Sequence, residues 1–436
     1  MARSAIILSL HEDNRETEEL LASLGYEVAA IHVQRRGRPD AATFVGKGKL
    51  EEIRASILGP REEKAVALRR ARDVPMAGKP DLVVVNGDLR ASQLYAMEST
   101  FATRVLDRIG LILEIFADRA TTEEARLQVE YAKLTFEIPM VKEFIHMTKR
   151  GEHPGFMAGG DYSVDNYYIT IQRRRTRIRK ELERIRKERS LRREHRRKGG
   201  YHLVSLAGYT NAGKSALLRC LSGADVTVEN RLFSTLSTTT RRADSPKRHI
   251  LVTDTVGFIE RLPPWLVEAF HSTLEEVSQS DVIVLVVDAS DAVPEIERKL
   301  RVSLGILWDL KVASPILVAV NKIDRVTPEH LDLVLATVRA KGLVAPENWV
   351  CTSALQGTGI PALYEAIENR LPRYVTLEAD LAMGPASEAL LSRLYDATDV
   401  VDVTRGESIR VRFEVREILG AQYRALLDSH GAVWAT

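Results

Sequence analysis

A nine-residue stretch has the residue types and spacing of a phosphate-binding loop. It reads Gly208-Tyr209-Thr210-Asn211-Ala212-Gly213-Lys214-Ser215-Ala216, after an apolar run at 202–207 that predicts a strand. The two pattern glycines let the backbone curl so that successive N–H groups face a phosphate, and a helix predicted over 216–221 adds partial positive charge. We therefore expect Lys214 to neutralise β- and γ-phosphate oxygens and the Ser215 hydroxyl to ligate Mg²⁺. The alternative is a glycine-rich turn that binds nothing.

Three further motifs each follow a predicted strand. In Asp254-Thr-Val-Gly257 the Asp can hold the magnesium shell and the Gly257 N–H can reach a γ-phosphate. In Asn321-Lys322-Ile-Asp324 the Asp324 carboxylate can accept both N1–H and the exocyclic amine of guanine, whereas adenine leaves it unpaired. Ser353-Ala354 can cover the base. Because nucleotide sites form at the carboxyl ends of strands in doubly wound sheets, the four motifs together predict a GTP site.

The hydrolysis step is less clear from the sequence. A threonine of the first switch must sense the γ-phosphate through magnesium, and the sequence offers Thr238, Thr239 and Thr240. Many small GTPases have a water-orienting Gln after this glycine motif, but Phe258 stands there, and a phenyl ring cannot orient water. Either another group does so or a partner completes the site. Asn211 could help hold a K⁺ ion beside the phosphates, or could only stabilise its turn.

Charge is unevenly spread along the chain. The formal net charge is only +2, yet residues 173–198 contain 15 Lys and Arg against 4 Glu. This excludes a uniformly basic protein and predicts one cationic helix whose counter-surface is RNA phosphate. The alternative is a solvated helix face. The Gly46-Lys-Gly-Lys49 stretch could also contact phosphate, or could be a tight turn before a helix.

The remaining patterns predict an α/β multidomain protein. Residues 1–120 alternate strands (5–10, 27–33, 81–85) with helices (16–24, 49–58, 91–101), which indicates an α/β subdomain with a mostly parallel sheet. Residues 121–198 predict an antiparallel helical hairpin with heptad seams at Leu127, Tyr131, Leu134, Ile138, Val141 and Ile145, and at Ile171, Ile178, Leu182 and Ile185. Pro139 should kink or interrupt the first helix, and a break is predicted at 151–160.

Two further domains follow the hairpin. Residues 201–372 predict a doubly wound P-loop GTPase domain with strands at 202–207, 249–253, 282–287, 316–320 and 349–351. Residues 373–436 predict a small α+β domain with the order strand (374–381), helix (388–395), strand (400–403), strand (409–414), helix (421–429). Two cysteines give no disulfide framework, and no stretch approaches the roughly 20 apolar residues of a membrane span. We expect a soluble, cytoplasmic monomer without membrane insertion.

These stretches together resemble the HflX family of translational GTPases, within the Obg-like group. GYTNAGKS at 208–215, LFSTL at 232–236 and DTVGFI at 254–259 look like that family's P-loop and switches, with Phe258 a family trait. FVGKGKLEE at 44–52, DRIGLILEIFA at 107–117 and LQVE at 127–130 look like its amino-terminal motifs. The resemblance covers nearly the whole chain.

The resemblance implies a GTPase that binds the large ribosomal subunit, is stimulated by ribosomes, and splits or rescues ribosomes under stress. It implies Thr239 as the magnesium-linked threonine, beside Lys214 and Gly257 in hydrolysis. The chain departs from the family pattern at residues 157–162, at Ala216, where a Thr often touches the α-phosphate, and at Ser237-Thr238, where Asp-Pro is usual. The alternatives are a GTP-dependent RNA-binding or assembly scaffold, and a membrane- or protein-directed switch without RNA.

Overall fold

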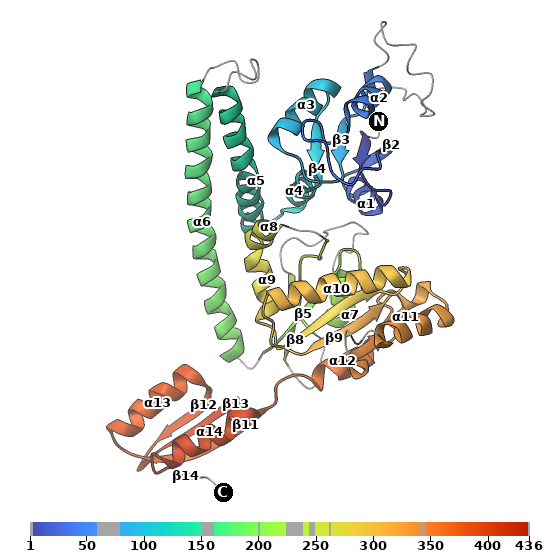
Figure 1. Cartoon of the computed structure of the whole chain (residues 1–436). Helices are drawn as coiled ribbons and strands as arrows, with labels where there is room; N and C mark the ends of the chain where they lie inside the picture. Colours follow the sequence, from blue (N-terminus) through green and yellow to red (C-terminus); the bar gives the residue numbers. More distant parts are fainter. Residues whose placement is uncertain are drawn as a thin grey trace. The chain divides into compact units, whose positions relative to one another are not determined.

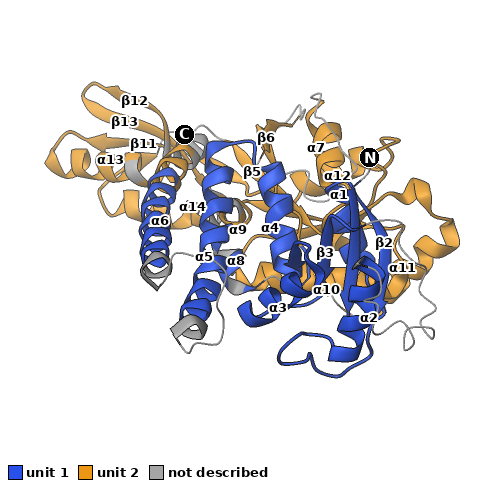
Figure 2. Ribbon diagram, turned by 90° about the horizontal axis from the view of Figure 1, so that it is seen from above, with its two compact units in different colours: residues 1–185, 229–237, 259–272 blue, residues 186–228, 238–258, 273–436 orange. Residues whose placement is uncertain are grey.

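The computed structural model describes residues 3–58, 79–149, 161–198, 201–223, 239–243, 249–260, 263–340, 342 and 345–434. They form two compact units, coloured separately in Figure 2. Unit 1 comprises the described residues within 1–185 and 259–272, and unit 2 those within 186–228, 238–258 and 273–436. No helix among the described residues is both long enough and apolar enough to cross a bilayer.

Unit 1 begins with a four-stranded parallel sheet in the order β2-β1-β3-β4 (Figure 1). The two inner strands are buried nearly throughout, as expected for a parallel sheet whose connections are helices. This confirms the predicted α/β layer. Its elements are β1 (Arg3–Ser9), α1 (Arg15–Ser23), β2 (Tyr26–Val33), α2 (Lys47–Leu58), β3 (Leu82–Val85), α3 (Ala91–Phe101), β4 (Val105–Asp107) and α4 (Arg108–Arg119).

A pair of long helices completes most of unit 1. Helix α5 (Glu123–Lys149) and helix α6 (Asp161–Lys198) pack through a cluster centred on Leu134, Ile138, Ile171 and Ile178, which confirms the predicted seams from 127 to 141 and from 171 to 182. Glu130 pairs with Arg174, and Glu137 accepts a hydrogen bond from Tyr167, which fixes an antiparallel register. Helix α5 continues through Pro139 without interruption, because apolar packing around Ile138 holds it on both sides of the missing N–H. The predicted break at 151–160 lies outside the described residues.

Unit 2 contains a six-stranded sheet in the order β10-β9-β8-β5-β7-β6. From β5 the chain goes to the edge strand β6 and returns to β7 beside β5, then continues on the other side through β8, β9 and β10, so the topological switch point lies at β5. Only β6 is antiparallel, pairing with β7. The strands are β5 (His202–Gly208), β6 (Thr239–Arg242), β7 (Ile250–Asp254), β8 (Val282–Asp288), β9 (Ile316–Asn321) and β10 (Trp349–Cys351).

Helices follow the strands of this sheet and pack its apolar core. One cluster of buried residues includes Leu206 of β5, Val284 of β8 and Leu317 of β9. It also includes Leu217 of the helix after the predicted loop and Leu363 near the end of the sheet region. The helices are α7 (Lys214–Ser222), α8 (Pro264–Ala269, in unit 1), α9 (His271–Ser278), α10 (Val293–Asp309), α11 (Pro328–Ala340) and α12 (Ile360–Glu368).

The end of the chain forms a separate βαββαβ layer within unit 2. Its antiparallel sheet has the order β12-β13-β11-β14, the split βαβ arrangement. A core of its own includes Leu377, Leu390, Leu394 and Phe413. The predicted strands and helices are present, with one further strand at the edge. The elements are β11 (Tyr374–Ala382), α13 (Pro385–Ala397), β12 (Asp399–Arg405), β13 (Ser408–Arg416), α14 (Glu417–Asp428) and β14 (Val433–Trp434).

Candidate nucleotide-binding site

The predicted phosphate loop connects β5 to α7 at the switch point of the sheet. Gly208 has φ +136°, and a Cβ there would lie 2.3 Å from the Val286 carbonyl oxygen. Gly213 has φ +97°, and a Cβ there would lie 2.2 Å from Nδ2 of Asn321. Both positions therefore require glycine for backbone conformation and for space. Asn211 also has a left-handed backbone, at φ +62°, so its turn role is compatible with the structure.

Lys214 lies inside the curl of this loop. Its Nζ donates to the carbonyl oxygens of Gly208 at 3.1 Å and Tyr209 at 2.9 Å. Burial lowers its pKa to about 8, although the nearby Asp254 charge opposes that shift. A desolvated ammonium group at the start of a helix favours an anion such as a phosphate.

The residues predicted to serve magnesium are brought together at the ends of three elements. Ser215 Oγ donates to Asp254 Oδ2 at 2.6 Å, and Thr239 is the β6 partner of Asp254 in the antiparallel pair. The hydroxyl of Thr240 instead bonds to that of Thr253, at 2.9 Å. Thr238 lies outside the described residues. Of the two described candidates, Thr239 is thus the one paired with Asp254.

This donor set fits Mg²⁺ rather than an ion held by the protein alone. No group of three or more His, Cys, Asp or Glu residues suited to a metal occurs among the described residues. Mg²⁺ is typically held by one or two protein oxygens, with phosphate and water completing its octahedron. One serine hydroxyl beside a buried aspartate meets that requirement.

The switch II segment, residues 254–260, lies directly on the phosphate loop. A Cβ at Gly257 would lie 2.7 Å from Cγ2 of Thr210 and 3.0 Å from Nζ of Lys214, so only glycine fits. The Phe258 N–H donates to the Gly208 carbonyl at 2.9 Å, and the Thr210 N–H donates to the Phe258 carbonyl at 3.0 Å. The Phe258 side chain is buried. Its backbone, not its ring, therefore faces the loop.

The predicted base-recognition residues also converge. Asn321 donates from Nδ2 to the Ala212 carbonyl at 3.0 Å and accepts at Oδ1 from the Ala354 N–H at 3.1 Å. Its side chain thereby links the phosphate loop to the loop predicted to cover the base. Ser353 Oγ donates to Asp324 Oδ1 at 2.5 Å, which fixes the orientation of that carboxylate.

Sequence reasoning missed Asp288, Cys220 and Gly359 around this site. The predicted Lys322, at φ +64°, donates from Nζ to Asp288 Oδ2 at 2.6 Å. Asp288 ends β8, and an acidic residue directly after an apolar strand was its only signal. Cys220 of α7 donates to the Ala354 carbonyl at 3.0 Å. A Cβ at Gly359 would lie 2.0 Å from the Cys351 carbonyl oxygen.

The remaining predicted contact residues occupy the loop as expected, with different exposures. Tyr209 and Ala212 are buried, and Lys299 Nζ lies 5.2 Å from the centre of the Tyr209 ring. Ala216 lies in the first turn of α7 and is half-buried. Gly46 lies directly before α2, and its N–H donates to Gln34 Oε1 at 2.8 Å; Lys47, Gly48 and Lys49 form the first turn of α2.

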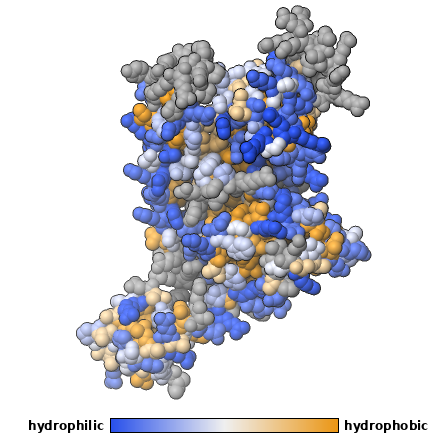
Figure 3. All heavy atoms as spheres, in the orientation of Figure 1, coloured by the Kyte–Doolittle hydropathy of each residue, from blue (hydrophilic) through white to orange (hydrophobic). Residues whose placement is uncertain are grey.

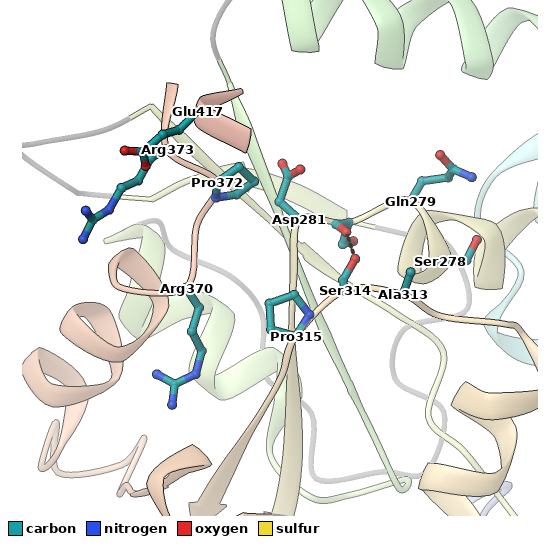
Figure 4. Close-up of a pocket in the computed structure, with 11 residues that line it drawn as sticks. Ser278, Gln279, Asp281, Ala313, Ser314, Pro315, Arg370, Pro372, Arg373 and Glu417 are labelled. Atoms are coloured by element: carbon teal, nitrogen blue, oxygen red, sulfur yellow. Dashed lines mark hydrogen bonds between the residues drawn. The ribbon is translucent and has the colours of Figure 1, made fainter. Parts of the chain in front are cut away.

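A cavity lies where β8 and β9 begin, at the ends of these strands opposite to the phosphate loop. It has a volume of about 440 Å³ and is lined partly by residues just before β8 and β9 and by the start of the last domain. Figure 4 shows that the side chains of Asp281 and Arg370 do not point toward one another. Arg370 is engaged with Asn348 Oδ1 at 2.7 Å and the Glu347 carbonyl at 2.6 Å. The Arg370 side chain therefore stabilises the local fold.

The basic helix has a stripe of exposed cations that form no ion pair among the described residues. Arg173, Arg177, Lys180 and Lys187 follow helical spacing, are exposed, and form no ion pair within the described part of the chain. Other arginines of α6 are neutralised: Arg179 by Glu183, Arg184 by Glu181 and Arg186 by Glu275. Hydrophilic residues cover most of the visible length of α6 in Figure 3.

Comparisons with known proteins match nearly all of the chain. Family models described as "GTP-binding GTPase N-terminal", "GTP-binding GTPase Middle Region" and "50S ribosome-binding GTPase" match residues 11–117, 119–196 and 203–322. The GTPase HflX of Thermococcus kodakarensis is 39% identical over 404 residues, covering 91% of this chain and 87% of the relative. That of Methanocaldococcus jannaschii is 37% identical over 409 residues, covering 93% and 94%. A GTP-binding protein from Sulfolobus solfataricus in complex with GDP is 26% identical, covering 84% and 98%, with a TM-score of 0.45.

Proposed function

Because the chain belongs to the HflX family of GTPases, we propose that it binds the large ribosomal subunit and splits or rescues ribosomes under stress. The chain is a GTPase. The observation that carries the ribosomal proposal is the breadth of the similarity, which includes the amino-terminal sheet and the helical hairpin as well as the GTPase sheet. The cationic stripe on α6 supports it independently.

The phosphates would be held by this chain's own loop. The N–H groups of residues 211–216 and the Lys214 ammonium bind the β- and γ-phosphates, and Gly257 presents its N–H to the γ-phosphate. Lys214 must exchange its bonds to the two loop carbonyls for phosphate oxygens. When the buried ammonium moves from the backbone carbonyls to a phosphate, it gains a partner with a full negative charge. This favours nucleotide binding.

Magnesium would be held by Ser215 and Thr239, with Asp254 orienting Ser215 from 2.6 Å. When bound, the ion neutralises charge on the β- and γ-phosphate oxygens. We also propose that K⁺ binds beside Asn211 at the exposed edge of the loop. Both assignments rest on side-chain oxygens beside the place where the phosphates would lie.

The base is proposed to be guanine. The Asp324 carboxylate, already oriented by Ser353, accepts the N1–H and the exocyclic amine, while Lys322 and Ala354 flank the ring. Asn321 holds the two loops in register. Adenine would leave the carboxylate without donors, at a cost of about 1–3 kcal/mol.

The parts of the chain divide the work. We assign an α/β subdomain to residues 1–120, a hairpin to 121–198, a GTPase domain to 201–372 and a small last domain to 373–436. The stripe of Arg173, Arg177, Lys180 and Lys187 contacts ribosomal RNA phosphates, which positions the protein without reading sequence.

GTP turnover measured with and without large ribosomal subunits, in sodium and then in potassium, tests this function. Turnover should rise on adding subunits, and co-sedimentation with them should weaken as salt increases. Binding without any rise in turnover would favour the GTP-dependent scaffold. Absence of both binding and stimulation would reject a ribosomal role.

A further inference from the structure

Arg108 is a buried cation that contacts the switch II segment. It opens α4, and its side chain is only 9% exposed. Its Nη2 donates to Glu16 Oε2 at 2.6 Å and to the backbone carbonyl of Glu260 at 2.7 Å. Burying a guanidinium is costly unless acceptors are fixed around it. The Glu260 carbonyl is one of those fixed acceptors.

The chain that follows Glu260 packs into the same unit. Phe270 lies edge-on to Phe116 of α4, with ring centres 4.7 Å apart, and Trp265 of α8 stacks on Phe136 of α5 at 6.1 Å. Leu266 is fully buried. Residues 259–272 therefore belong to unit 1, although their sequence lies inside the GTPase region.

Glu260 is only three positions after Gly257, which contacts the phosphate loop. Gly257 lies against Lys214 and Thr210, and Phe258 is bonded to the loop backbone on both of its polar groups. The short segment is consequently held at two ends, by the loop at Phe258 and by Arg108 at Glu260. In this arrangement the Lys214 ammonium is bonded to loop carbonyls rather than directed at a ligand.

We propose that Arg108 is a positioning residue for switch II, which, paired with Glu16, restrains Gly257 through the Glu260 carbonyl. Presentation of the Gly257 N–H to a γ-phosphate and reorientation of Lys214 both require the segment to shift. A segment tethered at both ends populates such shifted conformations less than one tethered at a single end. Arg108 thereby holds basal turnover down in the absence of a partner.

The test measures basal GTP turnover of the full chain without ribosomes. Arg108→Gln should raise kcat by about fivefold or more while KM changes little, because the substitution frees the segment without touching the nucleotide. Arg108→Lys should lie between the natural protein and Arg108→Gln, since an ammonium can donate to the carbonyl but lacks the planar guanidinium whose Nη2 holds both Glu16 and Glu260. A kcat that is unchanged or lower in Arg108→Gln overturns the proposal.

Arg119→Gln is the matched control. Arg119 lies on the same helix, has similar burial, and donates to the Ser23 carbonyl at 3.2 Å, away from switch II. It should leave kcat unchanged even if it lowers the stability of unit 1 to the same extent. A similar rise in both variants would mean that general loosening, not positioning, raises turnover, and would overturn the proposal.

Hydrogen exchange gives a second readout that does not depend on turnover. The amides of residues 257–260 should exchange faster in Arg108→Gln than in Arg119→Gln; equal rates contradict the anchor. The inference rests on the proposed role of Gly257 at the γ-phosphate, which loss of GTP binding in Lys214→Ala tests separately. It does not depend on ribosome binding, because no ribosome is present.

Discussion

At the level of single residues, the phosphate loop could be predicted because its chemistry demands fixed residue types at fixed spacing. Gly208 and Gly213 are required by backbone conformation and by the closeness of Val286 and Asn321. Residues that act through the fold could not be predicted in this way. Asp288 and Arg108 find their partners far away in sequence, and no local pattern reports such a pairing.

The proposed guanine contact predicts a change of base preference. Asp324→Asn should keep the bond from Ser353 but replace an acceptor oxygen by an N–H₂ donor. GTP affinity should fall by about 100-fold, which corresponds to roughly 3 kcal/mol for a lost charged pair of hydrogen bonds. Xanthosine triphosphate should bind better than it binds to the natural protein. Competition binding with both nucleotides measures this.

Lys214→Ala is the comparison for that experiment. Because Lys214 lies at the phosphate loop, its loss should weaken GTP and the xanthosine nucleotide about equally. A selective loss of GTP in Lys214→Ala, or unchanged base preference in Asp324→Asn, would remove the base assignment.

At the level of elements, periodicity predicted the long helical pair and most strands but missed three short strands, β4, β6 and β14. The seam from Leu134 to Ile178 gave a clear heptad signal, because one face of each helix is buried. Strands β4 and β14 have three and two residues, too few to show an alternation. Strand β6 is half-buried at best and reads TTRR, so it lacks the apolar signal of the inner strands.

The start of α4 predicts a pH effect on stability. Asp107 caps the helix, accepting from the Gly110 N–H at 2.6 Å, and burial raises its pKa to about 6. A raised pKa favours the protonated form in the folded state, so this contribution is largest at low pH and is lost as pH rises through 6. Asp107→Asn removes it. The unfolding free energy of Asp107→Asn minus that of the natural protein should therefore increase by about 2 kcal/mol between pH 4.5 and pH 7.

Denaturant unfolding of both proteins at the two pH values checks that effect. Asp81→Asn is a suitable control, since Asp81 accepts a backbone N–H from Ser4 at an exposed position. A difference between natural protein and Asp107→Asn that does not vary with pH would contradict the assigned titration.

The basic helix predicts a salt-dependent loss of ribosome binding. Replacing Arg173, Arg177, Lys180 and Lys187 by Gln removes four exposed charges that form no ion pair among the described residues. The slope of log affinity against log salt should flatten by about 3. Replacing Arg179 and Arg184, which already have acidic partners, should change the slope less. Equal slopes in all variants would contradict an RNA contact through this face.

At the level of the whole molecule, the sequence did not predict which residues pack together in each core. Residues 259–272 follow a GTPase motif in the chain, yet they pack with α4 and α5 of unit 1. A hydrophobic pattern predicts that a residue is buried, but it does not predict which core the residue packs against. The fold class of each part could therefore be predicted, whereas this exchange between units could not.

Because the last domain has a core of its own, we expect that this domain can be removed while the GTP site is kept. Residues of the GTPase cluster end at Leu371, and the last domain has its own cluster from Leu377 onward. A chain ending at Pro372 loses the contact of His202 with Tyr374, whose rings lie 5.6 Å apart, worth about 1 kcal/mol. GTP affinity should stay within about twofold, since no site residue is near the cut. A tenfold loss on titration would show that the last domain supports the site.

Helix α6 is one continuous element of 38 residues, so at 1.5 Å per residue it is about 57 Å long. Considered mechanically, such a helix is a lever, with residues 161–185 in unit 1 and residues 186–198 in unit 2. A tilt of about 5° at one end displaces the other by about 5 Å, close to one turn of helix. A change in helix angle that is too small to alter local packing therefore moves the far end of α6 by more than the length of a hydrogen bond.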